Sequence, residues 1–175
     1  MKWVKDKRIV SILWAILRIW LGYTWLHAGL VKTQNSSWFG AEAGSALTGF
    51  LQGAIGKATG DHPAVQQWFA SFLSTIALPN AVFFSYLVVF GEILVGIGLI
   101  TGTFTVISLL VSAFMNLNYM LAGASGLNPN MFVVAFVLLY VGSNAYFYGL
   151  DQWLLSKNCQ LWNWLKKNDK NLINS

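Results

Sequence analysis

The sequence predicts an all-α integral membrane protein, in which four transmembrane helices form a bundle and an amphipathic helical extracytoplasmic loop lies between helices 1 and 2. Hydrophobic residues make up 56 % of the 175 residues and charged residues only 10 %, whereas soluble domains carry about 25 % charge. Four continuous apolar segments each approach the ~20 residues that cross about 30 Å of hydrocarbon. They are residues 9–31, 81–100, 104–121 and 131–150. Because little chain remains outside them, residues 1–175 are expected to form a single membrane domain.

The distribution of basic residues predicts the orientation of the chain. Four precede the first segment and four follow the last: Lys2, Lys5, Lys7 and Arg8, then Lys157, Lys166, Lys167 and Lys170. By the positive-inside rule both termini, including the tail 151–175, are cytoplasmic and residues 33–80 lie outside. We therefore expect a multi-pass protein of the cell membrane that contacts membrane lipid. The basic residues are divided between the two ends and form no stripe, so they do not indicate a nucleic-acid partner.

Residues 33–80 form the longest connection and carry two amphipathic helix patterns, at residues 45–56 and 63–77. Asp61 and Pro63 flank a predicted helix start, with the proline in the first turn. Neither pattern is long enough to span a bilayer, so both are expected to lie in the outer interface or to cap the bundle. Two interpretations remain open: a lid with packing duties only, and a lid over a site that opens toward the outer leaflet.

Two charged residues lie alone inside apolar segments, Arg18 in the first and Glu92 in the second. An ionised side chain at the bilayer centre costs roughly 2.5–3.5 kcal/mol on insertion scales, so each needs a partner. If residues 9 and 100 mark the same membrane surface, Arg18 lies about 14 Å deep and Glu92 about 12 Å deep. We therefore predict that the two contact each other, or share one polar group, at mid-membrane. Such a pair either fixes the register of the helices or belongs to a buried polar site that binds or moves something.

Further polar residues gather toward the outer end of the segments. In the first segment, Arg18 and Lys32 delimit one narrow stripe along a helix, and His27 lies on the opposite face. The candidate catalytic residues are Arg18, Glu92 and His27, and the candidate substrate-binding residues are Lys32, Asn116, Asn118 and Tyr119. Structural roles are the competing interpretation, with His27 as a satisfied structural histidine and the polar stripe as contacts between helices.

The sequence contains no motif for an intrinsic redox cofactor. Cys159 is the only cysteine, and His27 and His62 are far apart in the chain. This excludes a cysteine-ligated iron–sulfur cluster and disfavours a transition-metal or bis-histidine haem site within one chain. There is neither a P-loop nor a GxGxxG after a strand, the fingerprint of flavin and nicotinamide sites. Any redox cofactor is therefore expected to be diffusible, such as a membrane quinone, or to belong to a partner.

Four segments carry a family resemblance: residues 18–32 (RIWLGYTWLHAGLVK), residues 91–102 (GEILVGIGLITG), residues 116–123 (NLNYMLAG) with Asn128 and Pro129, and Asn144 with residues 149–151. The first looks like the first helix of the DoxX/DoxD family, and the second is similar to that family's second-helix signature. The likeness covers nearly the whole chain. It is strongest for the DoxD-like branch, whose archaeal members are the large subunit of a thiosulfate:quinone oxidoreductase. The resemblance implies a four-helix membrane domain, quinone-linked sulfur chemistry and a small partner subunit; a homo-oligomer is the other expectation.

We therefore predict a membrane oxidoreductase component that couples thiosulfate oxidation to quinone reduction. In this hypothesis Lys32 and His27 attract a sulfur oxyanion, and the third segment supplies neutral donors. Arg18 and Glu92 form the buried floor, which holds the helices in register or passes protons. Two alternatives from another class remain open: a non-catalytic scaffold or assembly factor, and a lipid- or quinone-binding protein without turnover.

Overall fold

The computed structural model describes residues 7–142 and 148–151, and all the regular structure in these residues is helical. The elements are α1 (Lys7–Thr33), α2 (Ser45–Gly56), α3 (Gln67–Phe72), the π-helix η2 (Leu73–Ala77), α4 (Ala81–Thr101), α5 (Thr105–Leu121) and α6 (Asn128–Val141). This confirms the predicted all-α class. The predictions for residues 1–6, for Asn144 and for residues 152–175 with Cys159 lie outside the described residues.

The four long helices correspond in order to the four predicted segments. Among the described helices, α4 is the one that is both long and apolar enough to cross a bilayer, with a mean hydropathy of 2.2 in its most apolar window. Helices α5 and α6 are shorter and apolar. The arrangement with four spans and the placement of both termini in the cytoplasm therefore stay predictions.

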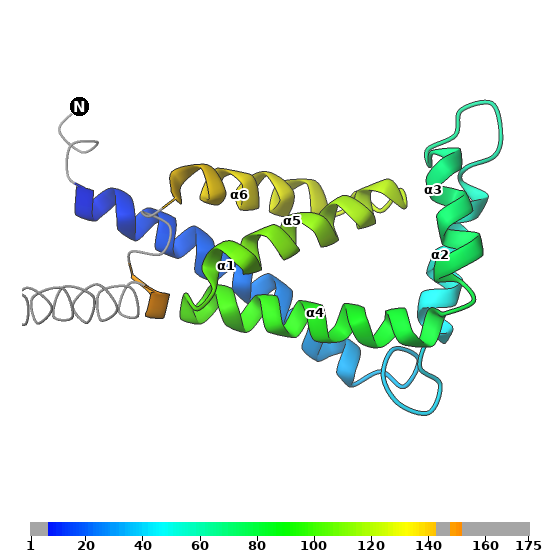
Figure 1. Ribbon diagram of the computed structural model, residues 1–175, viewed down its shortest axis with the longest axis horizontal. Helices are drawn as coiled ribbons and strands as arrows, with labels where there is room; N and C mark the ends of the chain where they lie inside the picture. Colours follow the sequence, from blue (N-terminus) through cyan, green and yellow to red (C-terminus); the bar gives the residue numbers. More distant parts are fainter. Residues whose placement is uncertain (1–6, 143–147, 152–175) are drawn as a thin grey trace, which may run out of the picture.

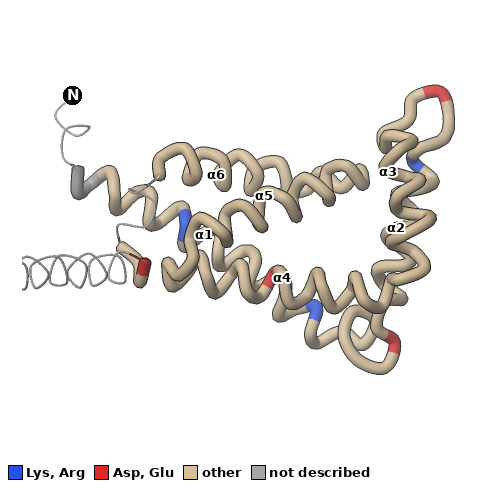
Figure 2. Tube along the Cα trace, viewed as in Figure 1, with Lys and Arg blue, Asp and Glu red and all other residues tan. Residues whose placement is uncertain are grey.

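The long helices lie side by side, and α2 and α3 stand across one end of them (Figure 1). The start of α1 and residues 148–151 lie at the opposite end (Figure 1). Each long helix contributes buried apolar side chains to a shared core: Leu21, Trp25, Val95, Leu99, Leu109, Ala113, Met131, Ala135 and Leu138. Charged residues are few along these helices (Figure 2), and large apolar side chains such as Leu94 and Phe114 point outward.

Glycines set the register between α1 and α4. A Cβ built on Gly96 would lie 2.6 Å from the backbone nitrogen of Leu26, and one built on Gly22 would lie 2.9 Å from the backbone nitrogen of Ile100. A Cβ on Gly29 would collide with Ile93. The two backbones are therefore in close contact over two turns or more, as small residues permit in membrane helix pairs.

This register shows that the predicted Arg18–Glu92 contact is wrong. The guanidinium of Arg18 lies against Gly102, which is ten residues beyond Glu92 and so about 15 Å farther along α4. The depth estimate fails because it places residues 9 and 100 at one level, whereas Ile100 packs opposite Gly22.

The capping helices form a second small core of their own, whose buried members include Leu47, Leu51, Phe69 and Leu73. Helix α2 agrees with the predicted pattern at residues 45–56, but the next helix begins at Gln67 rather than at Pro63. The backbone N–H groups of Ala64 and Val65 both donate to the carbonyl of Lys57, which closes residues 57–65 into a loop.

Helix α6 differs at both ends from the predicted segment 131–150. It begins at Asn128, with Pro129 in the first turn, where a missing N–H costs no hydrogen bond. It ends at Val141, because Gly142 has φ 59° and ψ −124°, a conformation that side-chain-bearing residues rarely adopt. Helix α6 therefore ends inside the predicted segment, at Val141.

Candidate functional site

Glu92 is the centre of a buried polar cluster that joins three helices. Its side chain is almost fully buried in α4. The ammonium of Lys32, in the last turn of α1, donates to Oε1 and to Oε2 at 2.8 Å each. The hydroxyl of Tyr119, near the end of α5, donates to Oε1 at 2.9 Å. A buried carboxylate needs such compensation, since an unpaired one is strongly destabilising.

Aromatic contacts hold the ring of Tyr119 in place. The indole of Trp25 lies nearly parallel to it with ring centroids 6.5 Å apart, and Phe50 of α2 meets it edge-on at 6.1 Å. Trp25 is itself fixed, because its Nε1–H donates to the hydroxyl of Ser112 at 2.7 Å. Tyr119 is therefore positioned by α1, α2 and α4 together.

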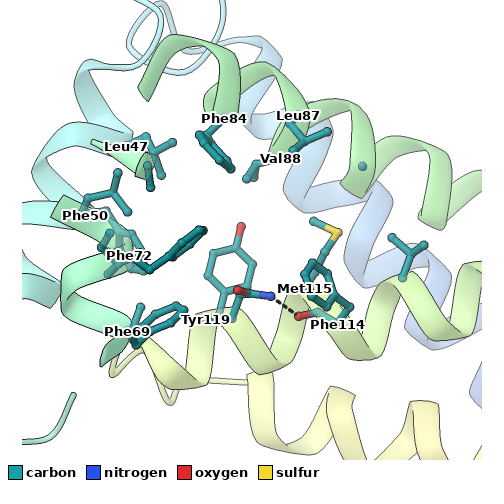
Figure 3. Close-up of a pocket in the computed structure, with 17 residues that line it drawn as sticks. Leu47, Phe50, Phe69, Phe72, Phe84, Leu87, Val88, Phe114, Met115 and Tyr119 are labelled. Carbon is teal, nitrogen blue, oxygen red and sulfur yellow. Dashed lines mark hydrogen bonds between the residues drawn. The ribbon is translucent and has the colours of Figure 1, made fainter. Parts of the chain in front are cut away.

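Tyr119 also lines a cavity of about 310 Å³ between the capping helices and the pair α4–α5. Figure 3 shows its ring projecting into the space between these elements. The walls are otherwise almost wholly apolar and rich in phenylalanine: Phe50, Phe69, Phe72, Phe84 and Phe114, with Leu47, Leu51, Leu73, Ala77, Leu87, Val88, Gly91, Val111, Met115 and Ala122. Besides Tyr119, Asn118 is the polar residue of this lining.

The cavity reaches the outer surface of the helix pair. Helices α4 and α5 meet near residues 102–104 and diverge toward the end that α2 and α3 close (Figure 1). Two side chains of the lining, Leu87 and Phe114, are more than half exposed, at 54 % and 67 %. The rim is thus apolar, and an apolar molecule can approach from the side of the bundle.

Hydrogen bonds connect this cavity to the surface without a gap. The phenol of Tyr119 contacts Glu92, Glu92 contacts Lys32, and the side chain of Lys32 keeps 19 % of its surface exposed. The ammonium of Lys32 also lies 5.2 Å from the ring centroid of Trp38, in the loop after α1. Such a chain of donors and acceptors can hold a ligand oxygen and move a proton.

The structure brings together Glu92, Lys32 and Tyr119 of the candidate residues, and places Asn118 on the cavity wall. The amide of Asn118 donates to the carbonyl of Phe114 at 2.8 Å. Asn116 is fully buried on α5, and its amide has no hydrogen-bond partner among the described residues. Its part in substrate binding stays a prediction.

Arg18 and His27 lie outside this cluster. The guanidinium of Arg18 donates to the carbonyl of Tyr148 at 2.7 Å and lies between Gly102 and Gly149. The side chain of His27 is exposed and contacts the ring of Tyr23. The structure therefore separates Arg18 and His27 from Glu92, and their catalytic roles remain untested predictions.

Sequence reasoning missed two groups of residues. The first is the phenylalanine lining of the cavity. The amphipathic spacing of Phe50, Phe69 and Phe72 indicated helices, and Phe84 and Phe114 lie in apolar segments, so neither pattern indicated a cavity. The second is Asp151, whose carboxylate accepts from the backbone N–H groups of Phe104 and Thr105 at 2.8 and 2.7 Å and so caps α5. An acidic residue far along the chain carries no local signal for this role.

A comparison with protein families decides the relationship of the chain. The model of the family described as "TQO small subunit DoxD" matches residues 13–172. The chain belongs to the DoxD family. TQO denotes thiosulfate:quinone oxidoreductase, and the DoxD family is membrane-associated. No curated protein and no solved structure matches the chain.

The DoxD match corrects one part of the sequence-based resemblance. The DoxX/DoxD relationship is confirmed, but DoxD is the small subunit and not the large one. The expectation of a small partner was drawn from that error. Membership of a multi-subunit enzyme family fits a partner subunit, and the small one is the DoxD chain itself.

Proposed function

We propose that this DoxD-family chain is the quinone-binding membrane subunit of a thiosulfate:quinone oxidoreductase. The observation that carries the proposal is the apolar cavity with one positioned phenol, that of Tyr119, tied to the buried pair of Glu92 and Lys32. The family description supports the overall reaction, the oxidation of thiosulfate by quinone. The cavity supports the assignment of quinone binding to this chain.

A quinone fits the cavity in size and in chemistry. A cavity of roughly 150 Å³ holds a benzene ring, so one of about 310 Å³ admits a substituted ring and the first part of an isoprenoid tail. Phenylalanine walls suit a flat ring, and the rim at Leu87 and Phe114 lets the tail leave toward lipid. The hydroxyl of Tyr119 donates to Glu92 in this structure, and it supplies a donor for one quinone oxygen once its O–H turns toward the cavity.

The reaction divides naturally between this chain and a partner. Two thiosulfate anions that join through a new S–S bond release two electrons, and a quinone that takes up two electrons and two protons becomes a quinol. Lys32 was expected to attract the anion, but its ammonium is held by both oxygens of Glu92. We therefore place thiosulfate at the partner subunit or at its interface with this chain, and the quinone in the cavity.

A photoreactive quinone analogue tests the proposal on the purified chain in lipid nanodiscs. We expect cross-links on α4, α5 and the segment α3–η2, which an excess of unlabelled quinone abolishes. Gly91→Leu places a side chain on the cavity wall, where the nearest atom to a built Cβ is the flexible end of Met115 at 3.3 Å. It should weaken labelling at least tenfold.

The matched control is Gly53→Leu, because a Cβ on Gly53 of α2 meets nothing within 4 Å. It should label like the wild type. Cross-links elsewhere, or labelling that Gly91→Leu leaves unchanged, would contradict the quinone site. A chain that binds no quinone yet co-purifies with a partner oxidoreductase would favour the scaffold instead.

A further inference from the structure

We propose that Lys32 and Glu92 relay protons to Tyr119, and through it to the quinone, from the side of the protein that carries α2 and α3. This inference rests on the proposed function and adds the proton route and the residues that form it. Tyr119 would contact the quinone directly, whereas Glu92 and Lys32 would act through Tyr119.

The geometry of Glu92 carries the inference. Its Oε1 atom accepts both from Lys32 at 2.8 Å and from Tyr119 at 2.9 Å. A proton that arrives at Oε1 from Lys32 can therefore pass to Tyr119 without rotation of the carboxyl group. Lys32 lies in the last turn of α1, next to the loop that leads to α2, and part of its side chain meets the surface.

The steps balance for a two-electron reduction. As electrons reach the quinone, the O–H of Tyr119 turns from Glu92 toward the cavity, which breaks its hydrogen bond to Oε1, and gives its proton to a quinone oxygen. Glu92 accepts a proton from the ammonium of Lys32 and passes it to the phenolate, which restores Tyr119 and the carboxylate. The neutral amine of Lys32 then takes a proton from solvent. Two such cycles, with two electrons from thiosulfate oxidation, convert the quinone to quinol.

A competing route through the bundle is less continuous. Thr105, Ser108, Ser112 and Asn116 are buried on one face of α5, and successive members are about 4.5–6 Å apart along the helix axis. Within the described part of the chain, neither the hydroxyl of Thr105 nor the amide of Asn116 has a hydrogen-bond partner. The shorter and unbroken connection is the one through Lys32.

Lys32→Arg separates a relay from a structural ion pair. Arginine keeps the positive charge opposite Glu92 but does not give up a proton in proteins. In the purified complex with its partner, supplied with thiosulfate and a soluble quinone analogue, we expect quinone affinity within about twofold of wild type and turnover reduced at least tenfold. Lys57→Arg is the matched control, because Lys57 donates to the carbonyl of Gly123 outside the cluster; it should turn over like wild type. A Lys32→Arg complex with wild-type turnover would overturn the relay.

The side of the membrane from which protons are taken up gives a second measurement, which is made first on the unmodified complex. The complex is reconstituted in vesicles, and its orientation is determined by labelling Thr59→Cys in the exposed loop after α2. With this loop outward, thiosulfate-driven quinone reduction should raise the pH of the external medium and leave a trapped dye unchanged. Uptake from the lumen, slowed by Asn116→Leu and not by Lys32→Arg, would assign the route to α5. An unmodified complex that neither binds nor reduces quinone would count against the proposed function itself.

Discussion

Gly96 of α4 lies so close to Leu26 of α1 that a Cβ at position 96 would approach the Leu26 backbone nitrogen to 2.6 Å. This contact fixes which residues of the two helices face each other. It places Glu92 near Gly29, within reach of Lys32, and leaves Arg18 at the far end of α4. The pairing of Glu92 with Lys32, rather than with Arg18, is therefore a consequence of the close backbone contact at Gly96.

Gly96→Ala should destabilise the protein, because the new methyl group meets backbone atoms that cannot move independently. Overpacking of this kind costs about 1–3 kcal/mol. Unfolding in a graded detergent mixture measures the change. Gly53→Ala is the control: it adds the same methyl group on α2, where a Cβ meets nothing within 4 Å. It should stabilise that helix by roughly 0.5–1 kcal/mol. Equal effects of the two substitutions would show that α1 and α4 are not in close contact.

Lys32→Met should cost more stability than Glu92→Gln. The first leaves the Glu92 carboxylate, whose side chain is 2 % exposed, without its cation, and breaking a buried pair in this way costs about 3–5 kcal/mol. The second leaves the ammonium of Lys32, whose side chain is 19 % exposed, and this ammonium can turn toward solvent. The double change should cost less than the sum of the two, which a double-mutant cycle of unfolding free energies measures.

Arg18→Leu and Glu92→Leu should be additive in the corresponding cycle. The structure places the two side chains in separate clusters, and substitutions more than about 7–10 Å apart usually add within ~0.5 kcal/mol. A coupling energy well above that value would restore the direct contact that the depth argument predicted.

Asp151→Ala should destabilise the start of α5. Both carboxylate oxygens accept from backbone N–H groups there, and loss of such a cap costs about 0.5–2 kcal/mol. Hydrogen exchange of the Phe104 and Thr105 amides should rise with it. Asp61→Ala, in an exposed loop, is the control and should change neither stability nor exchange; a similar change in both variants would argue against the cap.

The sequence predicts the helices much better than the contacts between them. Long apolar runs indicate which residues form α1, α4 and α5. A continuous apolar segment of about 20 residues in lipid satisfies its backbone hydrogen bonds by forming a helix. The partner of Glu92 depends instead on the relative shift of two helices, which the contact at Gly96 sets and which periodicity does not encode. Lys32, Glu92 and Tyr119 could be identified as candidate site residues from the sequence, because polar side chains in or beside apolar segments are few and costly to bury.

The cavity illustrates the other limit of the sequence. Its walls come from α2, α3, η2, α4 and α5, so its existence depends on the angle at which α4 and α5 diverge and on how the capping helices close the gap. The phenylalanines of the lining have the same spacing that any buried helix face shows. Only Tyr119 and Asn118 could be anticipated, because they are polar.

The contact between Arg18 and the carbonyl of Tyr148 spans 130 residues of sequence, and this has a consequence for biogenesis. Ribosomes add roughly 5–20 residues per second, so about 6–26 s separate the synthesis of the two partners. During that interval the first helix is already made, while the acceptor for its guanidinium is not. Completion of this contact therefore requires translation as far as Tyr148. A product that stops short of Tyr148 would lack this acceptor for Arg18.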